Sequence, residues 1–431
     1  MRLSAFVWLP VLGLLAACST STTEEQTQVK TETMADTANK VAASTTPPAR
    51  PDSVARPDSA TRPAPAASHR TLVPDTANVQ NVANYLAGLP PHAGSALTEL
   101  AAQPTWQAFA KTQSASWVKY RTTHTDRMTR WAATELDSVR QASPTLFYPF
   151  SGPDFLNAYT LFPSSNTYVM VGLEPVGSVP TQADLENPVL LSAVKKSLWS
   201  VLNFSFFRTN DMAVDLKSAH LDGTVPLIML FVARTGNHLL SVRAVQLNPQ
   251  GELQPADAPM PGQALTQKAV LTNIPGAELK IQAADGTEKT IYYFSADVSD
   301  YKLAKHDALL RYVRTLGPLT TYAKSATYLM HKSYFSKIRN LVLDRSNYLL
   351  QDDSGIAMKY FPKNLWDFTY YGTYRRPIPL FAKQYQPELT TIYHDTLRHV
   401  RPLPFGTGYN WQQSSSNLLL ARRRTPVAGS R

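Results

Sequence analysis

The chain of 431 residues contains a single cysteine, Cys18. No disulfide can therefore form within the chain, and a zinc site built from several thiolates is excluded. Many small secreted domains depend on disulfides for stability. The folded part of this protein must instead be stabilised by its apolar core.

The short motifs that mark common catalytic sites are also missing. The sequence has no HExxH, GxSxG or GxGxxG motif and no P-loop. The nine histidines show no metal-ligand spacing, since His394 and His399 are five residues apart and fall on different faces of a helix. A zinc enzyme and a nucleotide enzyme are therefore disfavoured, and we expect neither a metal nor a cofactor.

Long apolar runs are scarce. The run over residues 3–15 follows a single positive charge, Arg2, and is interrupted by Ser4, Pro10 and Gly13. A permanent membrane-spanning helix needs about 20 apolar residues, so this run is too short. Its layout is that of a secretory signal peptide over residues 1–17.

The sequence Leu-Ala-Ala-Cys over residues 15–18 resembles the lipobox of bacterial lipoproteins. The resemblance implies cleavage before Cys18 and lipidation of its thiol. It also implies that Cys18 carries three acyl chains, palmitate among them. Three chains hold a protein firmly in the membrane, whereas a single chain would anchor it only marginally. Ser19 stands where an Asp would resemble an inner-membrane retention signal, so the resemblance indicates the outer membrane. Glu24 and Glu25 resemble an acidic surface-export signal, but they also suit a solvated tether, so the periplasmic and cell-surface leaflets both stay open.

Residues 18–77 are predicted to form a lipidated, disordered tether. The segment is rich in Ser, Thr, Ala and Pro and has few large apolar residues, so burial cannot offset the loss of chain entropy. A near-repeat of Ala-Arg-Pro-Asp-Ser covers residues 49–53 and 55–59. Its prolines favour an extended spacer.

All four aspartates of the tether are followed by Ser or Thr and then by Ala or Val. This pattern resembles the acceptor motif of a periplasmic O-glycosylation system found in one large group of Gram-negative bacteria. The resemblance predicts glycans on four residues: Thr37, Ser53, Ser59 and Thr76. Duplication within a Ser/Thr-rich background would produce the same matches. Ser138 and Thr396 also match, but we expect helices to shield them.

Residues 78–424 are predicted to form one globular domain, followed by a flexible tail over residues 425–431. Large side chains recur on one helix face from Trp106 to Trp131, and His124 falls on that stripe as a core histidine. Asn187 and Pro188 favour a second helix start. The turn at residues 316–318 is predicted to separate two further helices, the second of which continues to about Leu350.

Short β-type runs lie between and after these helices. They cover residues 145–150, 167–173, 225–232, 239–247, 289–295, 366–374 and 417–421. The nearly continuous apolar run at 226–233 suits either a buried strand or a short core helix. We therefore predict an α+β fold, with a helical N-terminal part packed on a mixed, largely antiparallel sheet in a single composite domain.

Candidate site residues are polar groups at the ends of these elements. Asp154, Glu174 and Arg208 would form a general acid/base or polar-ligand site if their elements are neighbours. A helix cap and a structural salt bridge explain the same residues. Asp352 and Asp353 suit a cation site, an acid/base pair or an ordinary turn.

The C-terminal part is basic, with nine basic and two acidic residues from Arg375 onwards. Such a face attracts anionic glycans or the phosphates of lipopolysaccharide. The expected partners are the membrane, through the lipid anchor, and an envelope glycan or another envelope protein. Nucleic acid is not expected.

Four strings in the sequence together resemble an uncharacterised family of exported bacterial proteins. They are YPFSGPDF at 148–155, GLEPVG at 172–177, QDDSG at 351–355 and PLPFGTGY at 402–409. The resemblance implies one recurring folded unit and carries no activity. Two hypotheses follow: a non-catalytic envelope binding or assembly factor, and an envelope hydrolase using Asp154, Glu174 and Arg208.

Overall fold

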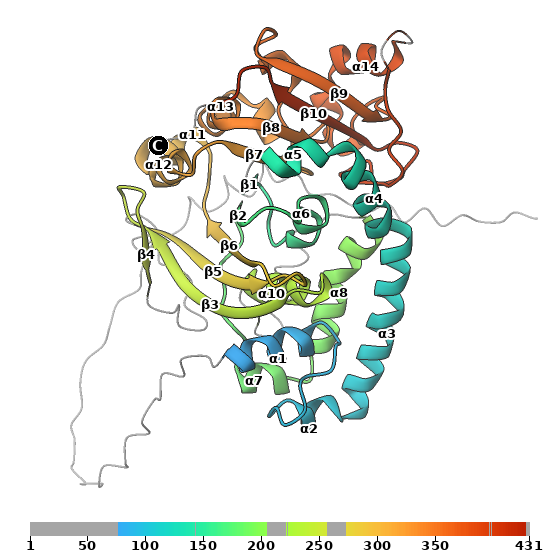
Figure 1. Ribbon diagram of the computed structural model, residues 1–431, viewed down its shortest axis with the longest axis vertical. Helices are drawn as coiled ribbons and strands as arrows, with labels where there is room; N and C mark the ends of the chain where they lie inside the picture. Colours follow the sequence, from blue (N-terminus) through green and yellow to red (C-terminus); the bar gives the residue numbers. More distant parts are fainter. Residues whose placement is uncertain are drawn as a thin grey trace, which may run out of the picture. The chain divides into compact units, whose positions relative to one another are not determined.

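One mixed sheet runs through the folded part of the protein (Figure 1). The computed structural model describes residues 76–142, 144–204, 221, 223–256, 273–395, 397 and 399–427. Within these ranges ten strands form the sheet: β1 (Thr145–Pro149), β2 (Thr167–Gly172), β3 (His238–Leu247), β4 (Leu253–Pro255), β5 (Ile274–Gln282), β6 (Glu288–Ser295), β7 (Leu319–Ala323), β8 (Ser346–Gln351), β9 (Trp366–Gly372) and β10 (Asn417–Arg423).

The strands lie side by side in the order β4-β3-β5-β6-β2-β1-β7-β8-β10-β9. The five central strands, β6 to β8 in this order, form four parallel pairs with one another, whereas the five outer pairs are antiparallel. Taken in chain order, the parallel strands are arranged 3-2-1-4-5, as in doubly wound sheets. In such sheets the crevice for a ligand lies at the carboxyl ends of the strands where the winding reverses, here between β1 and β7.

Helices cover both faces of the sheet. They are α1 (Thr76–Leu86), α2 (Thr98–Ala101), α3 (Pro104–Tyr120), α4 (Asp126–Glu135), α5 (Asp137–Ala142), α6 (Phe155–Leu161), α7 (Gln182–Glu186), α8 (Leu190–Phe204), α10 (Val225–Arg234), α11 (Asp300–Lys305), α12 (Ala308–Thr315), α13 (Ser336–Arg345) and α14 (Pro387–His394). A π-helical turn, η1 (Arg121–Thr125), joins α3 to α4, and short 3-10 turns lie at Leu329–His331, Ser333–Phe335, Met358–Tyr360 and Pro379–Gln384.

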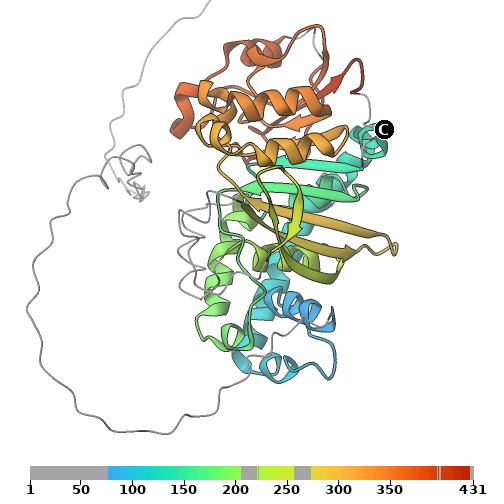
Figure 2. The same ribbon diagram turned by 90° about the vertical axis from the view of Figure 1, so that its left-hand side faces the viewer.

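The two faces carry separate cores because side chains alternate along each strand. Tyr148 and Tyr168 pack with α3, α6 and α10, whereas Phe147 and Val169 pack with α12 and α13. In Figure 2 the gold and orange helices, α11 to α13, lie in front of the sheet. All residues of β1 and β7 are buried, as expected for parallel strands covered on both sides. The fold is therefore the predicted α+β class.

Several local predictions are confirmed. The helical stripe from Trp106 to Trp131 forms one continuous run through α3, η1 and α4. His124 lies in the core, with its ring 4.8 Å from the Tyr120 ring and 6.0 Å from the Phe405 ring. Burial lowers the pKa of His124 to about 3, so the ring is neutral.

The apolar run at 226–233, which suits either a buried strand or a short core helix, forms helix α10, with Pro226 in its first turn. Two local predictions are wrong. The predicted helix after residue 318 is strand β7, and the following helix ends at Arg345 instead of Leu350. The remainder of that segment becomes β8 because it pairs with β7 on one side and β10 on the other. Tertiary pairing overrides local helix propensity here.

Candidate functional site

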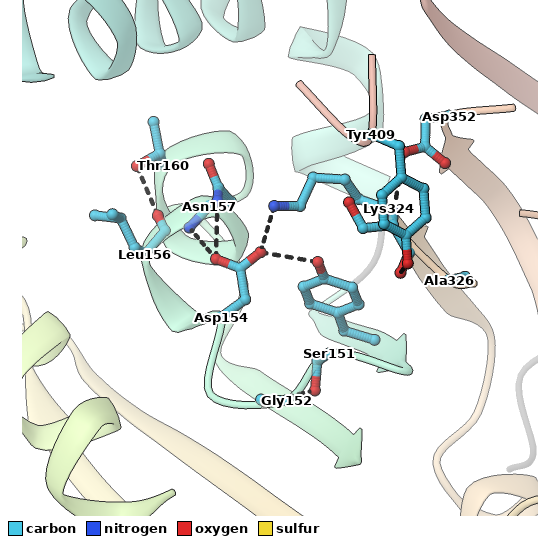
Figure 3. Close-up of polar contacts among 12 residues, drawn as sticks. Ser151, Gly152, Asp154, Leu156, Asn157, Thr160, Lys324, Ala326, Asp352 and Tyr409 are labelled. Atoms are coloured by element: carbon cyan, nitrogen blue, oxygen red, sulfur yellow. Dashed lines mark hydrogen bonds and ion pairs between the residues drawn. The ribbon is translucent and has the colours of Figure 1, made fainter. Parts of the chain in front are cut away.

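Polar and charged side chains gather at the carboxyl ends of β1, β7 and β8, where the winding of the sheet reverses. Asp154 follows β1, Lys324 follows β7, and Asp352 and Asp353 follow β8. Tyr148 and Asn157 complete the group, which we call the carboxyl-edge cluster. Figure 3 labels four of its members: Asp154, Asn157, Lys324 and Asp352. Each of its members is less than a tenth exposed.

Asp154 uses both carboxylate oxygens inside the protein. Oδ2 accepts a hydrogen bond from the Tyr148 hydroxyl at 2.9 Å and lies 2.8 Å from Nζ of Lys324. Oδ1 accepts from the side-chain and backbone nitrogens of Asn157, at 2.8 and 3.3 Å, and so caps helix α6. The Lys324 and Asp154 side chains are 2% and 3% exposed, so this is a fully buried ion pair.

Asp352 and Asp353 are adjacent buried carboxyls with separate partners. Asp352 accepts from the backbone N–H of Ser325 at 2.9 Å and from the hydroxyl of Ser354 at 2.5 Å. Asp353 accepts from the Tyr328 hydroxyl at 2.5 Å and from the Asn417 amide at 2.9 Å. Burial raises the pKa of Asp352, and burial together with the neighbouring Asp352 charge raises the pKa of Asp353 to about 7.

Backbone strain is concentrated at the same edge of the sheet. Among the described residues, four that are not glycine have a left-handed backbone: Phe150, Ser325, Thr327 and Tyr328, with φ between 51° and 61°. Phe150 directly follows β1, and the other three follow β7 within five residues. Such conformations cost on the order of 1 to 3 kcal/mol each and cluster at functional sites.

The C-terminal segment closes over the cluster. Gly408 has φ +71° and lies so close to the Asp352 carboxylate that a Cβ at this position would collide with it. The Tyr409 hydroxyl donates to the carbonyl of Ser325 at 2.9 Å. The edge of the sheet is thus covered by the chain itself.

The four strings singled out in the sequence converge on this region. Residues 148–155 and 351–355 supply most of the cluster, and residues 402–409 cover it. The fourth string, residues 172–177, reaches this region at Gly172. A Cβ on Gly172 would lie 3.2 Å from Cα of Gly152. Segments far apart in the sequence therefore build one neighbourhood.

Asp154 and Glu174 of the predicted site lie near Gly152 but bond to different partners. Glu174 lies beside Gly152, with its Oε1 3.2 Å from the position of a Cβ there, and its Oε2 and carbonyl accept from the Tyr293 hydroxyl at 3.3 and 2.9 Å. Asp154, two residues after Gly152, is bonded instead to Tyr148 and Lys324. Arg208 lies outside the described residues.

Lys324, Tyr328 and Asn417 were not identified from the sequence. Lys324 directly follows the fully buried strand β7, and Asp154 follows the buried strand β1 after a short turn. The signal was hidden because residues 319–323 were predicted as part of a helix. Within the described residues, no group of three or more His, Cys, Asp or Glu side chains is placed to hold a metal ion.

The predicted modification sites lie mostly outside the described ranges, as Cys18, Thr37, Ser53, Ser59 and Thr396 do. Thr76 is the first residue of α1, which corrects the expectation of extended backbone there. Ser138 lies in α5 as predicted, whereas the helix expected around Thr396 ends at His394. In the part of the chain that the structure covers, no helix is long and apolar enough to span a membrane.

The chain was compared with protein-family models, with curated proteins and with solved structures, and no match was found in any of the three.

Proposed function

We propose that the protein is an outer-membrane lipoprotein, anchored through Cys18, whose folded part binds an envelope glycan or another envelope protein without transforming it. The observation that carries this proposal is the internal pairing of Asp154. A general acid or base needs a lone pair or proton that faces the substrate. Both oxygens of Asp154 are instead bonded to Tyr148, Asn157 and Lys324.

The lipid anchor supports a binding role at a fixed place. The tether precedes a folded part that begins with α1 at Thr76. A protein held in this way samples ligands within reach of the membrane, so even a modest affinity gives high occupancy through the high local concentration.

A second candidate function, an envelope hydrolase, is favoured by the left-handed residues at the carboxyl edge, of which Tyr328 donates to Asp353. A carboxyl with a pKa of about 7 is half ionised near neutral pH, which suits an acid/base catalyst. In this alternative Asp353 exchanges the proton, and Tyr328 and Asn417 hold its carboxyl in place. The covering segment over residues 402–409 would then have to move aside for substrate.

One experiment separates the two functions. Full-length wild-type protein and the Asp353→Asn variant are incubated with isolated envelopes, and both the captured material and any released fragments are analysed by mass spectrometry. The binding proposal expects equal capture by both proteins and no fragments above the level without protein. The exposed carboxylate Asp344 on α13 provides the matched control, Asp344→Asn.

Release of fragments by wild type and by Asp344→Asn, but not by Asp353→Asn, would overturn the binding proposal and establish the hydrolase. Absence of capture by the wild-type protein would also refute it.

A further inference from the structure

A pocket of about 240 Å³ lies among the helices α3, α6 and α10, which cover one face of the sheet, apart from the covered carboxyl-edge cluster. Its walls come from α3 and η1, with contributions from α6 and α10. Ser114, Val118 and Arg121 on its rim are exposed, so the pocket is open to solvent. Leu156 of α6 is buried and forms an apolar part of the lining.

The charged side chains of the lining are both positive. Arg121 comes from η1 and Arg234 from the end of α10, and no carboxylate lines the pocket. Among the described residues neither arginine takes part in an ion pair. Two guanidinium groups beside one small volume create a local potential that favours an anion.

Arg234 is held in place without being neutralised. Its guanidinium donates to the Ala87 carbonyl and lies 5.3 Å from the centre of the Trp117 ring. Its Nε is buried and has no hydrogen-bond partner among the described residues. Burial lowers the pKa of Arg234 to about 10, which reflects the cost of removing a charge from water without a counter-ion.

Hydroxyl groups complete the polar lining. Ser114, Trp117, Arg121 and Thr125 follow one another at spacings of three and four residues, so they share one face of the continuous helix. Thr125 lies at the end of the π-helical turn, a feature that is frequent at functional sites. The Ser114 and Thr125 hydroxyls can donate to an anion or to sugar hydroxyls.

We infer that this pocket binds one anionic group, a phosphate or a carboxylate, carried on a body the size of a single sugar ring. Arg121 and Arg234 would clamp the anion, the two hydroxyls would bond to the sugar, and Leu156 would contact its apolar face. The volume lies below the roughly 300 to 1,000 Å³ of sites that take drug-sized ligands, which limits the occupant to about one ring. The inference rests on the proposed function, since it names the ligand of an envelope-binding protein.

The test uses full-length protein in mild detergent and four probes in calorimetric titrations: glucose 1-phosphate, glucuronate, inorganic phosphate and glucose. A sugar anion is expected to bind more tightly than inorganic phosphate, and glucose is expected not to bind. The stronger of the two sugar anions identifies the source, a phosphorylated headgroup or an acidic glycan. Binding should weaken as salt is added.

Arg121→Gln should weaken binding of that sugar anion at least tenfold, because it removes one of two charge-assisted partners. The matched control is Arg130→Gln, an exposed arginine of α4 outside the lining, which should stay within twofold of wild type. Ser114→Phe keeps both arginines and fills the pocket, so it should also abolish binding. Both positions in α3 and η1 are exposed, so unchanged thermal unfolding of these variants is expected.

The inference is overturned if neither sugar anion binds at millimolar concentration, or if Arg121→Gln and Arg130→Gln behave alike. If inorganic phosphate binds as tightly as either sugar anion, the inference that the ligand includes a sugar ring is overturned. Envelope capture that persists in Arg121→Gln and Ser114→Phe would reject this pocket while leaving the proposed binding function standing. Failure of capture by the wild-type protein would reject that function itself.

Discussion

Replacing Asp353 by Asn should make the protein more stable above neutral pH. The pKa of Asp353 is raised to about 7 in the folded protein, against about 3.9 in an unfolded chain. The folded state therefore keeps a proton that the unfolded state has lost between about pH 4 and pH 7. The free energy of unfolding falls as pH rises through this window, and the loss is complete above about pH 7.

The magnitude follows from the difference of about three pH units. At about 1.4 kcal/mol per unit, it corresponds to a loss on the order of 4 kcal/mol. The asparagine cannot ionise, and its oxygen can still accept from Asn417 while its nitrogen donates to the Tyr328 oxygen. A folded part of about 350 residues has an unfolding entropy of about 0.7 kcal/mol/K, so the variant should melt about 5 °C higher at pH 8.

The assay is differential scanning calorimetry of wild type, Asp353→Asn and Asp344→Asn from pH 4 to pH 8. The wild-type and Asp353→Asn melting temperatures should coincide near pH 4 and diverge with increasing pH. Buried His124 and His331 have lowered pKa values and add their own pH dependence, but it is common to all three proteins and cancels in the differences. Parallel pH curves for wild type and Asp353→Asn would refute the electrostatic account of this carboxyl.

Three further predictions concern the buried ion pair and the N-terminal segment. Lys324→Met should lower the free energy of unfolding by about 3 to 5 kcal/mol in calorimetry because it leaves the Asp154 carboxylate buried without its partner. Adding Asp154→Asn to this variant should recover part of that loss. If the losses of the two single variants simply add, the Lys324–Asp154 ion pair does not stabilise the fold. Cys18→Ala should remove the protein from the detergent phase and the membrane fraction, and unchanged partitioning would disprove lipid anchoring. Asp52→Ala combined with Asp58→Ala should abolish hexose-type mass additions on Ser53 and Ser59 and leave that on Thr37, as measured by intact mass and peptide mapping in the native host. A native mature protein with the mass of polypeptide and lipid alone would show that the motif matches are compositional.

Local sequence signals determined part of the fold because they depend on near neighbours. The apolar stripe from Trp106 to Trp131 has helical periodicity and forms α3, η1 and α4. A helix cap is one of the predicted explanations for Asp154, and the structure shows Asp154 capping α6. The lipobox and the tether motifs are likewise properties of contiguous residues, and they stay predictions.

The tertiary structure alone decided which residues meet. In residues 346–351 the sequence pattern does not favour a strand over a continuation of the preceding helix. They form β8 because β7 and β10 pair with them on both sides. Lys324 and Asp154 are separated by most of the sheet's chain length, and their ion pair exists because β1 and β7 are parallel neighbours. Periodicity and capping act over a few residues, whereas strand order and buried charge pairing depend on the whole sheet. A single sequence carries no direct record of them.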